Sequence, residues 1–200
     1  MPRRLTVAVE HFAIAGQFVI SRGARTEAVV VTATLTDGDH RGRGECVPYA
    51  RYGESVEGVA ATIESQRAAI AGGLDRTGLQ EVLPAGAARN ALDCALWDLE
   101  AKITGVPAHV LAGIARVPRT TTAYTISLGT PEAMGYAAQR SRRPILKIKL
   151  GGAGDPARIA AVRAAAPDAV IIADANEAWT PDMLADNLAA CDRAAVALVE

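Results

Sequence analysis

Leu146-Lys147-Ile148-Lys149-Leu150 alternates apolar residues with lysines. A β-strand has a side-chain period of two, so this stretch is predicted to be a short buried strand with Lys147 and Lys149 on one face. Two ammonium groups side by side inside a protein are unfavourable unless anions stabilise them or a function retains them. The two lysines are therefore the first candidate functional residues.

Two later strands end in acidic residues. The run Val170–Asp174 ends in an aspartate, and the run at 196–200 ends in a glutamate. Lys149, Asp174 and Glu200 follow one another at intervals of about 25 residues, shorter than the roughly 31 residues of one βα unit in an eight-unit barrel. Three successive strands are thus predicted to end in a lysine, an aspartate and a glutamate.

The segments around these strands contain three proline-marked helix starts, Thr130-Pro131, Asp155-Pro156 and Thr180-Pro181. A Thr or Asp N-cap followed by proline at the first helical position is a common way to begin a helix. With a further strand at 121–128, the order from about residue 120 is βαβαβαβ, which predicts a parallel sheet.

The N-terminal part has a different order of elements. A small antiparallel sheet is predicted from three strands, at residues 5–14, 28–36 and about 41–46. Between the first two lies a predicted loop, 17–25. Helical spacing of apolar residues follows over 56–70 and, more strongly, over 87–104. This order indicates an α+β domain of about 110 residues, with a boundary near residues 113–120.

Composition limits the class of protein. The chain has 200 residues, a net charge of −1 and no long apolar run, so we expect neither a nucleic-acid nor a membrane partner. Three cysteines, Cys46, Cys94 and Cys191, are far apart, which is typical of reduced thiols in the cytoplasm. Glu10 and His11 interrupt the apolar run after the basic start, so a signal peptide is not expected.

The charged strand ends suggest a chemistry. In parallel α/β proteins, active sites lie at the carboxyl ends of the strands, where Lys149, Asp174 and Glu200 are placed. Two carboxylates from neighbouring strands suit a hard divalent cation, and Mg²⁺ is the expected cofactor. A lysine crowded by a second lysine and by a metal has a lowered pKa and can act as a base near neutral pH. These groups could together remove the proton α to a substrate carboxylate.

Other interpretations of the same residues stay open. The segment 152–157 fits G-x-G-x-x-A, with Asp174 about where a ribose-binding acid lies, which would make a dinucleotide-binding domain. Against this, Asp155 puts a negative charge where a pyrophosphate belongs, and Glu200 has no role. Lysines at strand ends are often solvated, and an aspartate before a helix is often a cap or turn residue.

Five segments together resemble the enolase superfamily, its muconate-lactonizing subgroup and, within that, the L-Ala-D/L-Glu (dipeptide) epimerases. Residues 44–55 resemble the mobile loop of the capping domain, and residues 83–99 resemble its signature helix. Residues 146–150 are similar to the K-x-K strand of the family. Residues 174–179 are similar to its first metal-ligand strand, and residues 198–200 to the start of the second.

The resemblance implies a fold and an activity. The fold is an α+β capping domain followed by the first half of a modified (β/α)₇β, TIM-type barrel. The capping domain would span residues 1–115, and the first four barrel strands would lie in 116–200. The activity is that of an isomerase, a Mg²⁺-dependent epimerase of a small-molecule substrate, either a dipeptide or an N-acyl amino acid. A homo-oligomer is left open.

The resemblance also implies residue roles. Lys149 matches the acid/base lysine for one epimer, and Lys147 matches the neighbour that polarises the carboxylate and tunes that pKa. Asp174 and Glu200 match two of three metal ligands. Either Arg22 or Arg25 would hold a substrate side-chain carboxylate, with ordinary solvated loop charge as the alternative. The candidate substrate-binding residues are Arg22, Arg25, Tyr52 and Asn176.

The chain departs from the family pattern in two ways. The family needs a third acidic ligand on the fifth barrel strand and a second lysine, in a K-x-D motif, on the sixth, and the 200 residues contain neither. We therefore expect a truncated enzyme with little or no epimerase activity on its own. The alternatives are an N-acylamino acid racemase, a cycloisomerase or a dehydratase on the same scaffold, and a non-catalytic half-barrel.

Overall fold

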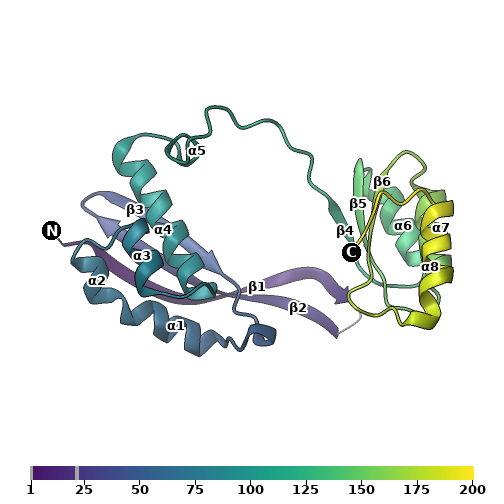
Figure 1. Cartoon of the computed structure of the whole chain (residues 1–200), viewed down its shortest axis with the longest axis horizontal. Coiled ribbons are helices and arrows are strands. Elements are labelled where there is room, and N and C mark those ends of the chain that lie inside the picture. Colours follow the sequence, from purple (N-terminus) through teal and green to yellow (C-terminus); the bar gives the residue numbers. More distant parts are fainter. Residues whose placement is uncertain (1, 21–22) are drawn as a thin grey trace. The chain divides into compact units, whose positions relative to one another are not determined.

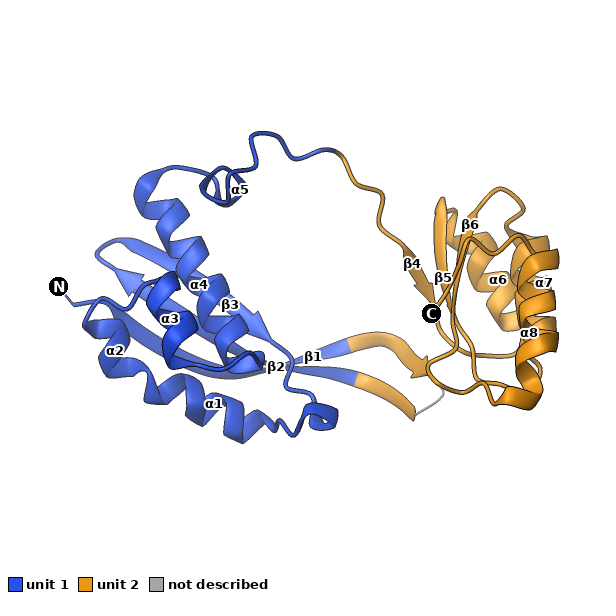
Figure 2. Cartoon of the chain, in the orientation of Figure 1, with its two compact units in different colours: residues 1–13, 27–118 blue, residues 14–26, 119–200 orange. Residues whose placement is uncertain are grey.

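The computed structural model describes residues 2–20 and 23–200 (Figure 1). The chain forms two compact units (Figure 2). The first unit contains the residues up to Ala13 together with Glu27–Pro118, and the second contains Ile14–Thr26 together with Arg119–Glu200. The domain bounds of 1–115 and 116–200 stay a prediction.

The antiparallel sheet has the order β1-β2-β3, with strands β1 Arg4–Ile20, β2 Gly23–Asp37 and β3 His40–Cys46. In β2 and β3, Val31 is opposite Cys46 and Asp37 is opposite His40. The three strands confirm the predicted sheet. The predicted loop at 17–25 is wrong over most of its length, because β1 runs on to Ile20 and β2 begins at Gly23.

The helices of the first unit follow the sheet, as expected. The strongest prediction, a helix at 87–104, is confirmed by α4. The predicted helix over 56–70 is two helices, because the chain departs from helical geometry at Gln66, next to a Ser65 hydroxyl that donates to the Thr62 carbonyl. The helical elements are η1 Ala50–Tyr52, α1 Val56–Ser65, α2 Arg67–Ala71, α3 Arg76–Val82, α4 Ala87–Thr104 and α5 Ala108–Leu111.

Two glycines let β3 pack directly against the backbone of α4. A Cβ on Gly42 would lie 2.2 Å from the Ala95 carbonyl oxygen, and a Cβ on Gly44 would lie 1.9 Å from that of Ala91. Neither separation is compatible with a side chain. The α4 face at this contact consists of buried small and branched residues, Ala91, Leu92, Ala95, Leu96 and Leu99. This face, the sheet and α1 to α3 form the first hydrophobic core.

The second unit contains a four-stranded sheet of order β4-β5-β6-β7, and the three described strand pairs are parallel. Consecutive strands are neighbours, as in a barrel, whereas a doubly wound dinucleotide-binding sheet reverses its order at a switch point. The elements are β4 Tyr124–Ile126, α6 Pro131–Ser141, β5 Ile145–Lys149, α7 Asp155–Ala165, β6 Val170–Asp174, α8 Pro181–Arg193 and β7 Leu198–Val199. This confirms an α+β unit followed by the first half of a barrel.

The two faces of the parallel sheet differ. Leu146, Ile148, Ile171 and Ala173 are fully buried and belong to the second hydrophobic core, together with apolar residues of α6, α7 and α8. Figure 1 shows these helices packed side by side along one face of the sheet. Because side chains alternate along a strand, the lysines and Asp174 are on the opposite face.

Only one of the three helix starts uses a side-chain cap. The Thr130 hydroxyl accepts a hydrogen bond from the Ala133 N–H at the start of α6. Thr180 is the N-cap of α8 without such a bond. The predicted cap at Asp155 is wrong, because Gly154, with φ +82°, is the N-cap of α7 and the carboxylate of Asp155 is used elsewhere.

Among the residues that the structure describes, no helix has the length and apolar character that crossing a membrane requires.

Candidate active site

Three strand ends bring charged side chains together in the second unit. Lys149 and Asp174 are register partners at the carboxyl ends of β5 and β6. Glu200 continues the ladder beyond β7, since its N–H donates to the Ala173 carbonyl at 2.8 Å and its carbonyl accepts from the Ala175 N–H at 3.0 Å. The sheet therefore places the three residues side by side at one edge.

The side chains of these strand ends form one connected cluster of opposite charges. The Lys149 Nζ lies 2.6 Å from Asp174 Oδ2, and the Lys147 Nζ lies 3.0 Å from the same oxygen. Lys147 also reaches Glu200, with its Nζ 2.5 Å from Oε2. Both lysines thus share Asp174, and Lys147 bridges the two carboxylates. We call Lys147, Lys149, Asp174 and Glu200 the strand-end cluster.

Burial increases from Glu200 to Asp174 within the strand-end cluster. The Glu200 side chain is 56% exposed and that of Lys147 is 25% exposed, whereas Lys149 and Asp174 are buried. Burial opposes ionisation of Asp174, but hydrogen bonds from Lys149, from Lys147 and from the backbone hold the pKa of its carboxyl below the ordinary value. The hydrogen bond to Glu200 raises the pKa of Lys147, although partial burial acts in the opposite direction. Lys147 is therefore a cation in this arrangement.

An aromatic ring near Lys149 was missed by the sequence analysis. The ring centroid of Phe18, near the end of β1, lies 5.7 Å from the Lys149 Nζ, within the range of a cation–π contact. The same strand segment is joined to the β4 edge, because the Leu128 N–H donates to the Val19 carbonyl at 3.1 Å. The sequence signal for this contact was the short apolar run at 18–20.

The loop after β6 has an unusual backbone. Asn176 and Glu177 have φ values of +48° and +63°, a left-handed conformation that is uncommon for residues other than glycine. The Asn176 N–H donates to Asp174 Oδ1 at 3.0 Å. This loop thus supports the second oxygen of the carboxylate that the lysines share. The expected substrate contact of Asn176 stays a prediction.

The other predicted substrate residues are less defined. Arg22 lies outside the described residues. Arg25 is exposed on β2. Tyr52 belongs to the first unit, where it is 77% exposed and its ring lies 5.6 Å from that of Tyr49. Their roles in substrate binding stay predictions.

The Glu54 carboxylate links the loop at 47–55, which carries Tyr52, to helix α4. Glu54 accepts a hydrogen bond from the Tyr49 N–H at 3.0 Å within the loop. Its other oxygen accepts from the Ala87 N–H, in the first turn of α4, at 2.7 Å. The base of the loop is therefore attached to the longest helix of the first unit.

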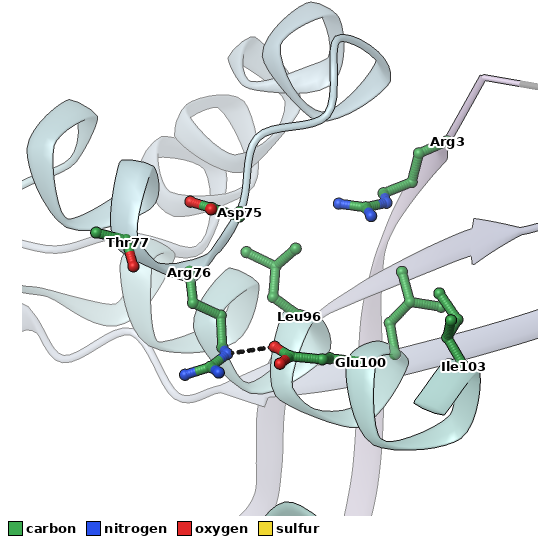
Figure 3. A pocket seen from close by; sticks show the side chains of 8 residues that line it. Arg3, Asp75, Arg76, Thr77, Leu96, Glu100 and Ile103 are labelled. Carbon is green, nitrogen blue, oxygen red and sulfur yellow. Dashed lines mark hydrogen bonds and ion pairs between the residues drawn. The ribbon is translucent and has the colours of Figure 1, made fainter. Parts of the chain in front are cut away.

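A cavity in the first unit is a weaker candidate site (Figure 3). It has a volume of about 340 Å³ and is lined by residues that include Arg3, Arg76, Leu96 and Glu100. Figure 3 shows the Arg76 guanidinium turned to Glu100, at 2.7 Å, and Arg76 also lies over the Trp97 ring. Arg3 donates to the Leu74 carbonyl. Because both arginines are engaged within the protein, we assign this cavity no function.

The carboxylates of the strand-end cluster fit a hard cation in part. One ammonium nitrogen lies within 3.0 Å of oxygens of both Asp174 and Glu200, so the two side chains converge on a single positive charge. Carboxylate oxygens are the ligands that Mg²⁺ prefers. Over residues 2–20 and 23–200, no group of three or more His, Cys, Asp or Glu side chains is placed to hold a metal. The chain thus provides two convergent carboxylates, short of a closed cage.

The dinucleotide interpretation of residues 152–157 is not supported. The Asp155 carboxylate accepts hydrogen bonds from the backbone N–H groups of Gly151 and Gly152, at 3.1 and 2.7 Å. These are the donors that a bound pyrophosphate would need. The glycine-rich turn is therefore occupied by the protein's own carboxylate.

Comparison with known proteins identifies relatives over most of the chain. The L-Ala-D/L-Glu epimerase of Escherichia coli (strain K12) is 44% identical over 186 residues, which cover 92% of this chain and 58% of that protein. The N-acetyl-D-glutamate racemase of a Pseudoalteromonas species is 36% identical, over 86% of this chain and 55% of that protein. The chain thus spans less than two thirds of the length of these relatives.

Solved structures agree with the fold. An enolase family member from Agrobacterium tumefaciens, with homology to dipeptide epimerases and with bound sodium and L-Ala-L-Glu, has a TM-score of 0.93 and 52% identity. The match covers 99% of this chain and 61% of that one. A dipeptide epimerase from Enterococcus faecalis V583, complexed with Mg and L-Leu-L-Tyr, has a TM-score of 0.88 and 27% identity, over 100% and 60% of the two chains.

A family model provides the classification. Residues 3–113 match the model of the mandelate racemase / muconate lactonizing enzyme N-terminal domain. This range includes the antiparallel sheet of β1, β2 and β3 and helix α4. The parallel sheet that follows carries the K-x-K strand and the acidic strand ends. The chain therefore belongs to the mandelate racemase / muconate lactonizing enzyme family of the enolase superfamily.

Proposed function

We propose that this chain contributes Lys149 as the α-proton base of a Mg²⁺-dependent dipeptide epimerase of the L-Ala-D/L-Glu type. The observation that carries the proposal is the strand-end cluster, in which Lys149 shares Asp174 with Lys147, and Lys147 bridges to Glu200. A buried lysine beside two convergent carboxylates is suited to removing a proton next to a metal-bound carboxylate. The relatives, an L-Ala-D/L-Glu epimerase and a protein with homology to dipeptide epimerases, support the same chemistry.

In this proposal Asp174 and Glu200 hold the cation, because they are the two carboxylates that already converge on one charge. When bound, Mg²⁺ would stabilise the negative charge that develops on the substrate carboxylate. Lys147, which is only partly buried, would then be released to bind a carboxylate oxygen of the substrate.

Lys149 has to be neutral in order to accept a proton at Nζ. In the structure its Nζ lies 2.6 Å from Asp174 Oδ2, in an ion pair with that carboxylate. If Asp174 and Glu200 held a cation, the Asp174 carboxylate would be engaged by it, and the Lys149 Nζ would be available to accept the proton. The Phe18 ring, whose centroid lies 5.7 Å from the Nζ, provides an apolar neighbour on one side of this amine.

The substrate class follows from what the relatives share. One relative is named for L-Ala-D/L-Glu and another for N-acetyl-D-glutamate. Both compounds contain a glutamate residue whose α-amino nitrogen is acylated. We therefore propose an N-acylated glutamate unit as the reacting group, with Arg22 or Arg25 as the partner of its side-chain carboxylate. An N-acylamino acid racemase on the same scaffold is the second candidate.

The test is α-proton exchange in D₂O. The 200-residue chain is incubated with Mg²⁺ and L-Ala-L-Glu, or with N-acetyl-L-glutamate, and loss of the Glu α-proton signal is followed by NMR. We expect slow exchange with little epimerised product, since the chain has no lysine for the opposite face. Lys149→Ala should abolish the exchange, whereas Lys102→Ala, in the first unit, should not. Exchange that persists in Lys149→Ala would contradict the proposal.

A further inference from the structure

The Asp155 carboxylate is fully buried and accepts hydrogen bonds from four different residues. Its oxygens accept from the N–H groups of Gly151 and Gly152, at 3.1 and 2.7 Å, from the Trp179 indole Nε1 at 2.8 Å and from the Arg158 Nη1 at 2.8 Å. An ionised carboxylate with several such donors is stabilised by charge-assisted hydrogen bonds. Its position is therefore fixed.

Three of these donors lie in the loops that follow β5 and β6, next to the strand-end cluster. Gly151 and Gly152 follow Lys149 directly after β5, and Trp179 is in the loop that follows Asp174 and β6. Residue 155 therefore joins the loop after β5 to the loop after β6. The ends of β5 and β6, whose side chains meet at Lys149 and Asp174, are thus also linked through their following loops.

Arg158 extends this link to a third loop. Its Nη1 donates to Asp155, while its Nε donates to the Gly129 carbonyl at 2.8 Å, in the loop after β4. The Arg158 side chain is only 21% exposed. One ion pair, formed within the first turn of α7, thus connects the loops that follow β4, β5 and β6.

We propose that Asp155 is a positioning residue that fixes the carboxyl ends of β5 and β6, so that Lys149 and Asp174 converge. It contacts neither side chain and acts through Gly151, Gly152 and Trp179. The inference rests on the proposed function, in which Asp174 binds the metal and Lys149 is the base. Substituting a residue that orients metal ligands without touching the metal typically lowers metal affinity or activity 10–100-fold.

Three substitutions in the 200-residue chain separate positioning from folding. Asp155→Asn keeps the shape of the side chain but places an NH₂ group against the hydrogen-bond donors that surround it. Asp155→Gly removes the carboxylate and leaves room for a formate ion in its place. Trp179→Phe removes one donor and keeps the ring in the core. Asp182→Asn, in the first turn of α8 and exposed, is the matched control.

Mn²⁺ is the probe of the carboxylate pair, and its affinity is measured by electron paramagnetic resonance. Urea unfolding of each variant gives the fraction that is folded under the conditions of the binding measurement. We expect 10–100-fold weaker binding in Asp155→Asn and Asp155→Gly, and about threefold weaker binding in Trp179→Phe. Formate should restore Asp155→Gly to within about threefold of the parent chain and leave the parent and Asp182→Asn unchanged. Parent-like Mn²⁺ affinity in all three variants would overturn the proposal.

A second measurement does not depend on metal binding. The Leu150 N–H, just after β5, donates to the carbonyl of Asp174 at the end of β6, so its hydrogen exchange reports whether the two strand ends stay together. We expect exchange at this amide to accelerate at least tenfold more in Asp155→Asn than at core amides of α6, which belongs to the same compact unit. A uniform acceleration that follows global stability would overturn the positioning role. If the parent chain binds no Mn²⁺, the proposed metal site fails while this exchange result still decides the inference.

Discussion

Lys149 and Asp174 are register partners on adjacent parallel strands, and their charged groups meet with 2.6 Å between Nζ and Oδ2. Backbone pairing and side-chain pairing thus coincide at one position of the sheet. Both residues are buried, so each charge depends on the other for stabilisation. The stability of the sheet edge and the chemistry of the site are consequently coupled.

Replacing Lys149 by methionine should destabilise the chain. Asp174 keeps Lys147 at 3.0 Å, so we expect a loss of about 1–3 kcal/mol in the free energy of unfolding, the range for a buried group that loses a partner. Urea unfolding measures it. The double variant Lys149→Met/Asp174→Leu should lose less than the sum of the single changes, because no buried charge is left alone. Strict additivity would show that the pair contributes no mutual stabilisation.

Replacing Lys147 by methionine should strengthen cation binding. The Lys147 ammonium lies between Asp174 and Glu200 and competes with a metal for both carboxylates. We expect about tenfold tighter Mg²⁺ binding by calorimetry, the equivalent of about 1.4 kcal/mol for a lost competing hydrogen-bonded charge. Asp174→Asn is the opposite control and should abolish binding. Weaker binding in Lys147→Met would show that this lysine assists the metal rather than competing with it.

Asp98 should contribute to the acid sensitivity of the first unit. Burial opposes its ionisation, but hydrogen bonds from Lys102 and from the Arg43 N–H lower its pKa. A carboxyl whose pKa is lower in the folded state stabilises the protein above its unfolded pKa of about 3.9, and this stabilisation is lost as the pH falls through the folded value. Asp98→Asn should therefore flatten the loss of stability below about pH 4. The measurement is urea unfolding at several pH values, with Asp192→Asn, at an exposed position, expected to keep the parent slope.

Gly44→Ala should unfold or severely destabilise the first unit. Its Cβ would lie 1.9 Å from the Ala91 carbonyl oxygen, and a backbone atom cannot move aside as a side chain can. We expect a loss of more than about 3 kcal/mol in the free energy of unfolding, which corresponds to an overpacked core. Gly72→Ala is the control, since its nearest neighbours lie at 3.4 Å, and its thermal midpoint should stay near that of the parent chain.

The strands and the strand-end cluster could be predicted because they depend on local patterns. Alternation of Lys147 and Lys149 with apolar residues sets the face, and the spacing of Asp174 and Glu200 sets the neighbouring strands. The helix at 87–104 was predicted correctly for the same reason, since its apolar period is long and regular.

Other features depend on contacts between distant segments and left no local signal. The ring of Phe18 reaches Lys149 across more than a hundred residues of chain. Asp155 was predicted to be an N-cap because an aspartate before a proline gives the same sequence pattern whether it caps the helix or accepts buried hydrogen bonds. Only the fold brings the indole of Trp179 to its carboxylate. The extension of β1 to Ile20 depends on its pairing with β2, which hydrophobic alternation alone does not reveal.

The attachment of Glu54 to the first turn of α4 has a consequence for how such a chain can diversify. Both ends of the 47–55 loop are tied to the same rigid body, by Glu54 at Ala87 and by the close fit of Gly44 against Ala91. The tip between them, with the exposed Tyr52, carries almost none of the core. Substitutions in this tip should therefore have little effect on stability, so the loop can vary in sequence while the scaffold is unchanged.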